Sequence, residues 1–153
     1  MNELNALFDS EPDELLAMLP GFQLKQVNEL RSQGKDYLTI ADGFLGATAS
    51  FNVGFGGDSN KPNLYREALV KELERFVCGD KRYKKERDQL AASANKSKEY
   101  IAGVISGAIG AYIGAVAVVI FPVIVLVIIN FGRVSVNAWC EMRQAQSGSS
   151  ETE

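Results

Sequence analysis

Few residues of this chain could carry out chemistry. The 153 residues include no histidine and two cysteines, Cys78 and Cys140. Histidine is the commonest general base and metal ligand, and two distant cysteines cannot complete a tetrahedral zinc site. No Walker motif, nucleophile elbow or dinucleotide fingerprint occurs, and the glycines at 54–57 lack the spacing of a phosphate-binding loop. We therefore expect no catalytic residue, metal or cofactor, and no enzymatic activity.

The most distinctive spacing joins small residues in the C-terminal half. One row, with a period of four, consists of Gly103, Gly107, Ala111 and Ala115. A parallel row on the adjacent face consists of Ser106, Gly110 and Gly114. Such rows form a groove into which a second membrane helix packs closely. Two rows suggest two neighbours, so we expect a homo-oligomer built through these residues.

These rows belong to a long apolar run. The 33 residues from Tyr100 to Gly132 carry no charge, although the chain has 19 acidic and 16 basic residues. Thirteen Val, Ile, Leu or Phe residues lie between Val116 and Phe131, and together they favour insertion by about 4 to 8 kcal/mol. A polar remainder of 99 residues is too small to cover such a helix on every side. The sequence therefore predicts a transmembrane segment over residues 100–132.

The length of the run leaves its topology open. A straight helix of that length would extend about 50 Å, well beyond a hydrocarbon core of about 30 Å. One span near residues 110–131 is the favoured arrangement. A strongly tilted helix is the second possibility. The third is a hairpin that turns near Phe121-Pro122 and leaves both termini in the cytoplasm.

Basic residues gather just before the run and predict its orientation. Within twenty residues they are Lys81, Arg82, Lys84, Lys85, Arg87, Lys96 and Lys98, whereas Arg133 and Arg143 alone follow the run over a similar distance. This asymmetry predicts a cytoplasmic N-terminal side in the cell membrane, which would be the inner membrane of a Gram-negative cell. The cluster would face anionic lipid headgroups. Because aromatic residues are sparse there and the net charge is −3, we expect no nucleic acid partner.

The remaining segments predict a mainly α-helical protein in four parts. Residues 1–79 form a cytosolic helical domain, in which Ser10 caps a first helix and Gly34 and Gly79 close later ones. Alternation near residues 44–57 suggests a short β-hairpin. Residues 80–99 form one basic helical connector. Residues 133–153 form a short interfacial stretch and a disordered tail. Because the two cysteines would face opposite sides of the membrane, no disulfide is expected.

This layout resembles that of small bacterial membrane effectors, including toxins and defence proteins, in which a sensing module controls a self-associating membrane segment. The resemblance implies an effector whose cytosolic domain receives a protein partner or small signal and whose glycine-rich segment permeabilises the membrane. The alternative is a membrane-tethered adaptor without pore activity, for which residues 100–132 serve only as an anchor.

Overall fold

The computed structural model describes residues 2–51, 62–114 and 117–151, and these residues are mainly α-helical with no strand. The mainly α fold class is therefore confirmed. In chain order the elements are α1 (Asn2–Phe8), α2 (Pro12–Leu16), α3 (Gly21–Ser32), α4 (Tyr37–Phe51), α5 (Pro62–Cys78), the 3₁₀ helix η1 (Lys81–Tyr83), α6 (Lys84–Ala92), α7 (Lys98–Ile113), α8 (Ala117–Phe131) and α9 (Val136–Glu151).

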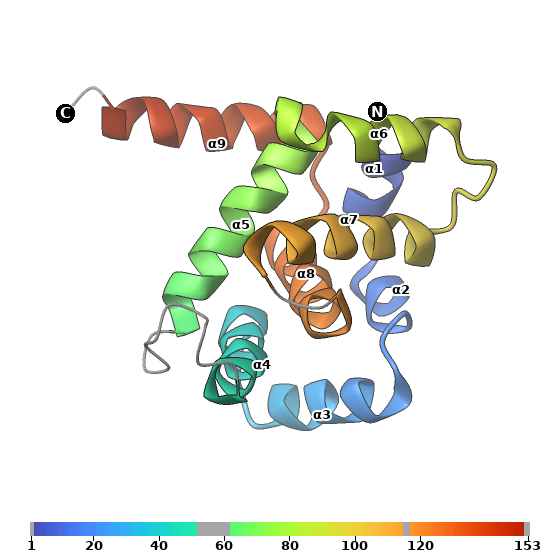
Figure 1. Ribbon diagram of the computed structural model, residues 1–153. Coiled ribbons are helices and arrows are strands. Elements are labelled where there is room, and N and C mark those ends of the chain that lie inside the picture. The colour runs from blue at the N-terminus through green and yellow to red at the C-terminus, as the bar shows by residue number, and fades with distance from the viewer. Residues whose placement is uncertain (1, 52–61, 115–116, 152–153) are drawn as a thin grey trace.

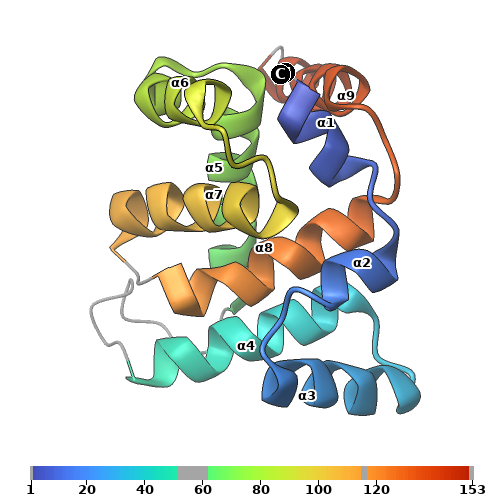
Figure 2. The ribbon, with the colours of Figure 1, turned by 90° about the vertical axis from the view of Figure 1, so that its right-hand side faces the viewer.

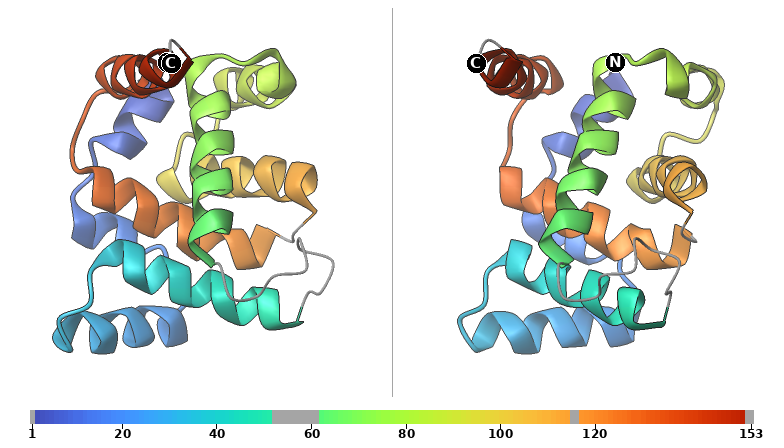
Figure 3. Two further views of the ribbon diagram at one scale, coloured as in Figure 1. Left: turned by 90° about the vertical axis from the view of Figure 1, so that its left-hand side faces the viewer. Right: turned by 60° about the vertical axis from the view of Figure 1, so that its left-hand side comes forward.

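The helices are arranged in three levels around α8. Figure 1 shows α8 in the middle, with α7 beside it, α3 and α4 below, and α1, α6 and α9 above. The view in Figure 2 shows the same order and places α2 alongside the end of α8. Helix α5 runs across these levels, from α4 to the level of α6 and α9 (Figure 3). Helix α8, the second half of the apolar run, thus lies at the centre of the molecule, packed mainly against α4 and α7.

The segment near residues 44–57 forms a helix as far as Phe51 and not a β-hairpin, and residues 52–61 lie outside the described part. Helix α4 directs Ile40, Ala41 and Leu45 into the core and leaves Phe44 partly buried beside them. This is the i, i+1, i+4, i+5 spacing of one helix face. Burial of that face outweighs the short alternation that suggested a strand.

The predicted connector over 80–99 is broken into separate elements. After α6 the backbone at Ser93 is extended, and α7 begins only at Lys98. Polar side chains bind backbone N–H groups along the break: Ser93 Oγ accepts from Asn95, Asn95 Oδ1 from Ser97, and Ser97 Oγ from Tyr100, at 3.0 to 3.2 Å. Serine and asparagine compete with helix formation in this way. A single stiff helix from the N-terminal part into the apolar run is therefore wrong.

The apolar run is also divided. Helix α7 ends at Gly114, whose φ of +84° lies in the left-handed region that favours glycine, and α8 begins at Ala117. The run therefore forms two helices in place of one, and the break lies earlier than Phe121-Pro122, which is inside α8.

Other predicted boundaries are partly correct. Gly34 and Gly79 follow α3 and α5 with positive φ, as expected of helix-ending glycines. Ser10 does not cap α2: the N-cap is Glu11, and Ser10 Oγ donates to the Ala6 carbonyl. The tail predicted to be disordered is helical as far as Glu151.

Candidate membrane-active segment

Helix α8 is the most apolar helix of the protein and lies in its interior. It has no charged residue, and its side chains from Val123 to Ile128 are at most 1% exposed. Burial around the whole circumference is expected of a helix enclosed by protein or by lipid. In this structure the covering is provided by neighbouring helices.

The covering is possible because apolar helices supply it. Helix α4 contributes Ile40 and Leu45, and the inner face of α7 contributes Ile101, Ile105 and Ile109, all at most 1% exposed. Half of the apolar run therefore covers the other half. The expectation that the remaining chain could not cover such a helix is wrong, because it counted residues 1–99 alone.

The two rows of small residues face different directions. Ser106 and Gly110 belong to the buried face of α7, where Ser106 Oγ donates to the Ala102 carbonyl. Gly103 and Gly107 are only half-buried, and a Cβ added at either would have no atom within 4 Å. Ala111 is exposed, Gly114 ends the helix, and Ala115 lies outside the described residues. The described residues of the first row are therefore open to a neighbour, while Ser106 and Gly110 of the second row are buried inside the protein and Gly114 is exposed.

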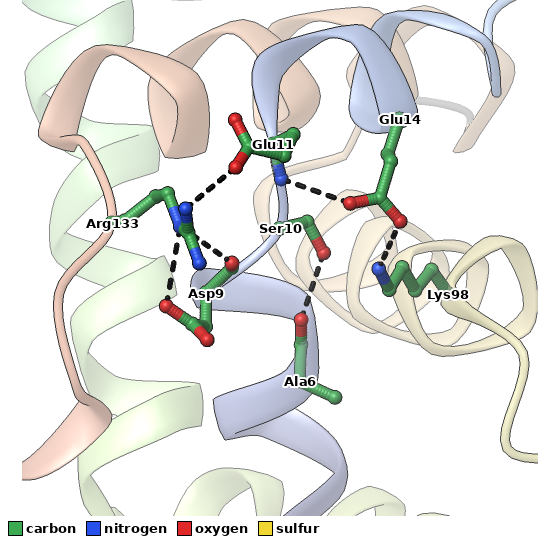
Figure 4. Close-up of polar contacts among 7 residues, drawn as sticks. All are labelled: Ala6, Asp9, Ser10, Glu11, Glu14, Lys98 and Arg133. Carbon is green, nitrogen blue, oxygen red and sulfur yellow. Dashed lines mark hydrogen bonds and ion pairs between the residues drawn. The ribbon is translucent and has the colours of Figure 1, made fainter.

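Both ends of the α7–α8 pair are bound by α2 and by the residues just before it (Figure 4). Arg133, just after α8, donates to the Asp9 carbonyl at 3.0 Å and to Glu11 Oε1 at 2.6 Å. Lys98, the first residue of α7, donates to Glu14 Oε2 at 2.7 Å. We call this group of contacts the acidic clasp. It joins the ends of the apolar pair to one short segment of the N-terminus.

The clasp is charge-assisted but open to solvent. The hydrogen bond from Lys98 and the backbone N–H of Glu11 hold the pKa of the Glu14 carboxyl below its ordinary value of 4.5. The Glu14 and Arg133 side chains remain about half exposed, at 52% and 51%. Exposed pairs of this kind contribute little to stability, because solvent screens the charges. The clasp therefore positions the pair more than it stabilises it.

Helix α9 covers the C-terminal end of α8. Trp139 is fully buried, with its ring centroid 5.3 Å from that of Phe8 and 5.1 Å from that of Phe131. An ion pair joins Arg143 to Glu74 of α5 at 2.9 Å. These contacts fold α9 back over the molecule.

The two cysteines form a disulfide between α5 and α9. Cys78 is the last residue of α5, and its Cα lies 5.7 Å from that of Cys140 in α9. The expectation that no disulfide would form is therefore wrong. That expectation followed from placing the cysteines on opposite sides of a membrane, whereas the folded arrangement brings them together across 62 residues of chain.

Most of the basic cluster is used within the protein. Arg87 donates to the carbonyls of Phe76 and Asp80 at the end of α5, and Lys96 donates to carbonyls at the end of α6. The remaining contacts join Arg82 to Glu72, Lys84 to Asp88 and Lys98 to Glu14. Exposed Lys81 and Lys85 make no side-chain bond within the described residues. A membrane-facing role for the whole cluster stays a prediction.

The buried Glu72 side chain links α5 to η1 and, through Arg82, to α7. Glu72 is 5% exposed and accepts a 2.7 Å hydrogen bond from the Tyr83 hydroxyl. Arg82 also binds Glu72, and its guanidinium carbon lies 3.8 Å from the ring centroid of Tyr112 in α7. Burial, followed by the bond to Glu72, raises the pKa of Tyr83. No pattern of spacing in the sequence indicated this network.

Among the described residues no group of three His, Cys, Asp or Glu is placed to hold a metal ion. Comparison with protein-family models, curated proteins and solved structures found no match.

The helices of the described ranges are short relative to a bilayer. None of them is long and apolar enough to cross one alone. One pair of consecutive segments, Ile120–Phe131 and Val136–Gln146, meets the length and composition required when taken together, but it is bent by 90°.

Proposed function

We propose that the protein is a membrane effector that carries its membrane-active helix enclosed in its own fold. The observation that supports this most is α8, whose side chains from Val123 to Ile128 lie at the centre of the molecule. A helix of this composition favours a bilayer once it is uncovered. The surrounding helices prevent that contact until the protein opens.

The manner of enclosure supports an effector over an adaptor. A simple anchor would have no need of an acidic clasp at both ends of the apolar pair or of a disulfide joining the helix after it to α5. Gly103 and Gly107 on the open face of α7 offer a surface for self-association after insertion. The partner or signal that opens the protein belongs to the same proposal.

The test adds unfolded protein to a bilayer, so that α8 meets lipid before the protein folds. Protein reduced with dithiothreitol in urea, so that the Cys78–Cys140 bond is open, is diluted into vesicles of phosphatidylcholine and phosphatidylglycerol that contain a self-quenched dye. We expect the wild-type chain to release the dye. Val125→Asp, which places a charge in the centre of α8, should reduce release at least tenfold, because a central charge opposes insertion by about 2.5 to 3.5 kcal/mol.

The matched control is Phe22→Asp on α3, where the ring is 72% exposed in the folded protein. This variant should release dye as the wild type does. Binding without release would favour the adaptor, and absence of both binding and release would contradict a membrane function. Equal loss in the two variants would show that α8 is not the active segment.

A further inference from the structure

The disulfide restricts how the chain can cross a membrane. A covalent bond keeps Cys78 and Cys140 on the same side, so the residues between them must cross a bilayer an even number of times or not at all. The single span favoured by the sequence places these cysteines on opposite sides. That topology therefore requires the bond to be broken.

The segment released by breaking the bond has the dimensions of a span. Helix α8 alone, with 15 residues, extends about 22 Å, less than the hydrocarbon thickness of about 30 Å. A straight helix from Ile120 to Trp139 would extend about 30 Å. Trp139 would then lie at the far interface, where tryptophan is favoured. Arg133 would lie within reach of the headgroups by extending its side chain.

The bend between α8 and α9 is made by residues that can straighten. Gly132 ends α8 with φ of +79°, and glycine reaches helical φ values with little penalty. Ser135 Oγ accepts from the Ala138 N–H and caps α9. The bend is held from outside by Arg133 in the acidic clasp and by Cys140 in the disulfide.

We infer, resting on the function proposed above, that the Cys78–Cys140 bond is a thiol-exchange site that determines whether α8 and α9 can form one membrane span. A pocket of about 270 Å³ lies beside it, lined by Glu74, Arg75, Cys78, Gly79, Asp80 and Gln144. A small thiol reaches Cys78 through this pocket. Oxidising surroundings keep the closed form, and reducing surroundings such as the cytosol permit the open one.

A dithiol supplies the electrons that reduce the Cys78–Cys140 bond. One thiolate of the dithiol attacks a sulfur of the bond, forms a mixed disulfide and releases the other cysteine as a thiolate, which takes up a proton. The second thiol then displaces the remaining cysteine and closes the reagent into a cyclic disulfide. Two electrons and two protons pass to the protein. The packing of Trp139 and the Arg143–Glu74 pair remain as barriers to opening.

The experiment adds folded protein to preformed vesicles of phosphatidylcholine and phosphatidylglycerol, with and without dithiothreitol. We expect reduction to increase at least tenfold the protein that floats with the vesicles, and reoxidation before mixing to restore the low value. Cys78→Ser and Cys140→Ser should each float without reductant. Circular dichroism before mixing identifies a variant that has merely unfolded, and reduced wild type gives the result independently of any substitution.

Topology is read with a maleimide that cannot cross the bilayer. In vesicle-bound Cys78→Ser, Cys140 should be protected until detergent is added, while in Cys140→Ser, Cys78 should react at once. Equal flotation of oxidised and reduced protein, or a reactive Cys140 in the bound protein, would overturn the inference. Failure of the reduced chain diluted from urea to insert would instead contradict the proposed function, so the two failures are distinguishable.

Discussion

Replacement of Trp139 by alanine should loosen the covering of α8 at its C-terminal end. The indole is fully buried between Phe8 and Phe131. Truncation of such a ring costs about 3 to 5 kcal/mol, from lost burial and from the cavity that remains. The total stability of a domain is about 5 to 15 kcal/mol, so this is a large part of it.

The matched variant is Trp139→Phe, which keeps an aromatic ring between the same neighbours. The indole Nε1 has no hydrogen-bond partner within the described residues, so loss of its N–H leaves no acceptor unsatisfied. We expect this variant to lose about 1.5 kcal/mol or less, as for other conservative changes of core volume.

Urea unfolding followed by circular dichroism at 222 nm measures both variants, because neither keeps the tryptophan of the wild type. In thermal unfolding, Trp139→Ala should lower Tm by about 6 to 20 °C, at about 2 to 4 °C per kcal/mol for a chain of this size. Equal destabilisation by the two substitutions would refute the reasoning, because it would show that ring packing does not hold α9 in place.

Three further changes, one of them with a matched control, test other parts of the structure. Gly114→Ala should destabilise by about 1 to 2 kcal/mol in urea, since φ is +84° there, while helical Gly107→Ala should be neutral or stabilising. Tyr83→Phe should cost about 1.5 to 3 kcal/mol in the same assay, because a charged Glu72 loses one donor. Glu14 has a lowered pKa when folded, so its contribution is present above pH 4.5 and is lost as pH falls through the folded value. Glu14→Gln should therefore flatten the acid limb of a stability–pH profile. A limb unchanged by that substitution would contradict a role for the clasp.

Local signals in the sequence account for the helices and several of their ends. Pro20-Gly21, Gly34 and Gly79 mark boundaries through backbone restrictions that act within a few residues. The break at residues 93–97 was missed, although serine and asparagine at positions 93, 95 and 97 are a local signal, because such side chains bind backbone N–H groups in competition with a helix.

The enclosure of α8 could not be predicted from local sequence patterns, because it depends on how distant helices pack. Gly103, Gly107 and Gly110 are helical and Gly114 is left-handed, although all four belong to rows with the same spacing of four. Packing of α7 against α8 selects which glycine ends the helix.

Contacts between residues far apart in the sequence could not be predicted from it either. The clasp joins residues more than 80 positions apart, and the disulfide joins residues 62 apart. Hydropathy identified a segment that must leave water, but protein and lipid satisfy that requirement equally well.

The decisive experiment tests whether α8 enters a bilayer. Phe131→Trp combined with Trp139→Phe exchanges two rings that already touch, so one indole and one phenyl remain in contact. Phe22→Trp with Trp139→Phe places the indole on the exposed start of α3 as the control. Both are reduced with dithiothreitol in urea and diluted into vesicles whose lipids carry bromine at mid-chain, and fluorescence is compared with that in unbrominated vesicles. If α8 enters the bilayer, the indole at position 131 is strongly quenched and the indole at position 22 is quenched little. Equal quenching at the two positions would contradict the proposal that α8 is the membrane-active segment.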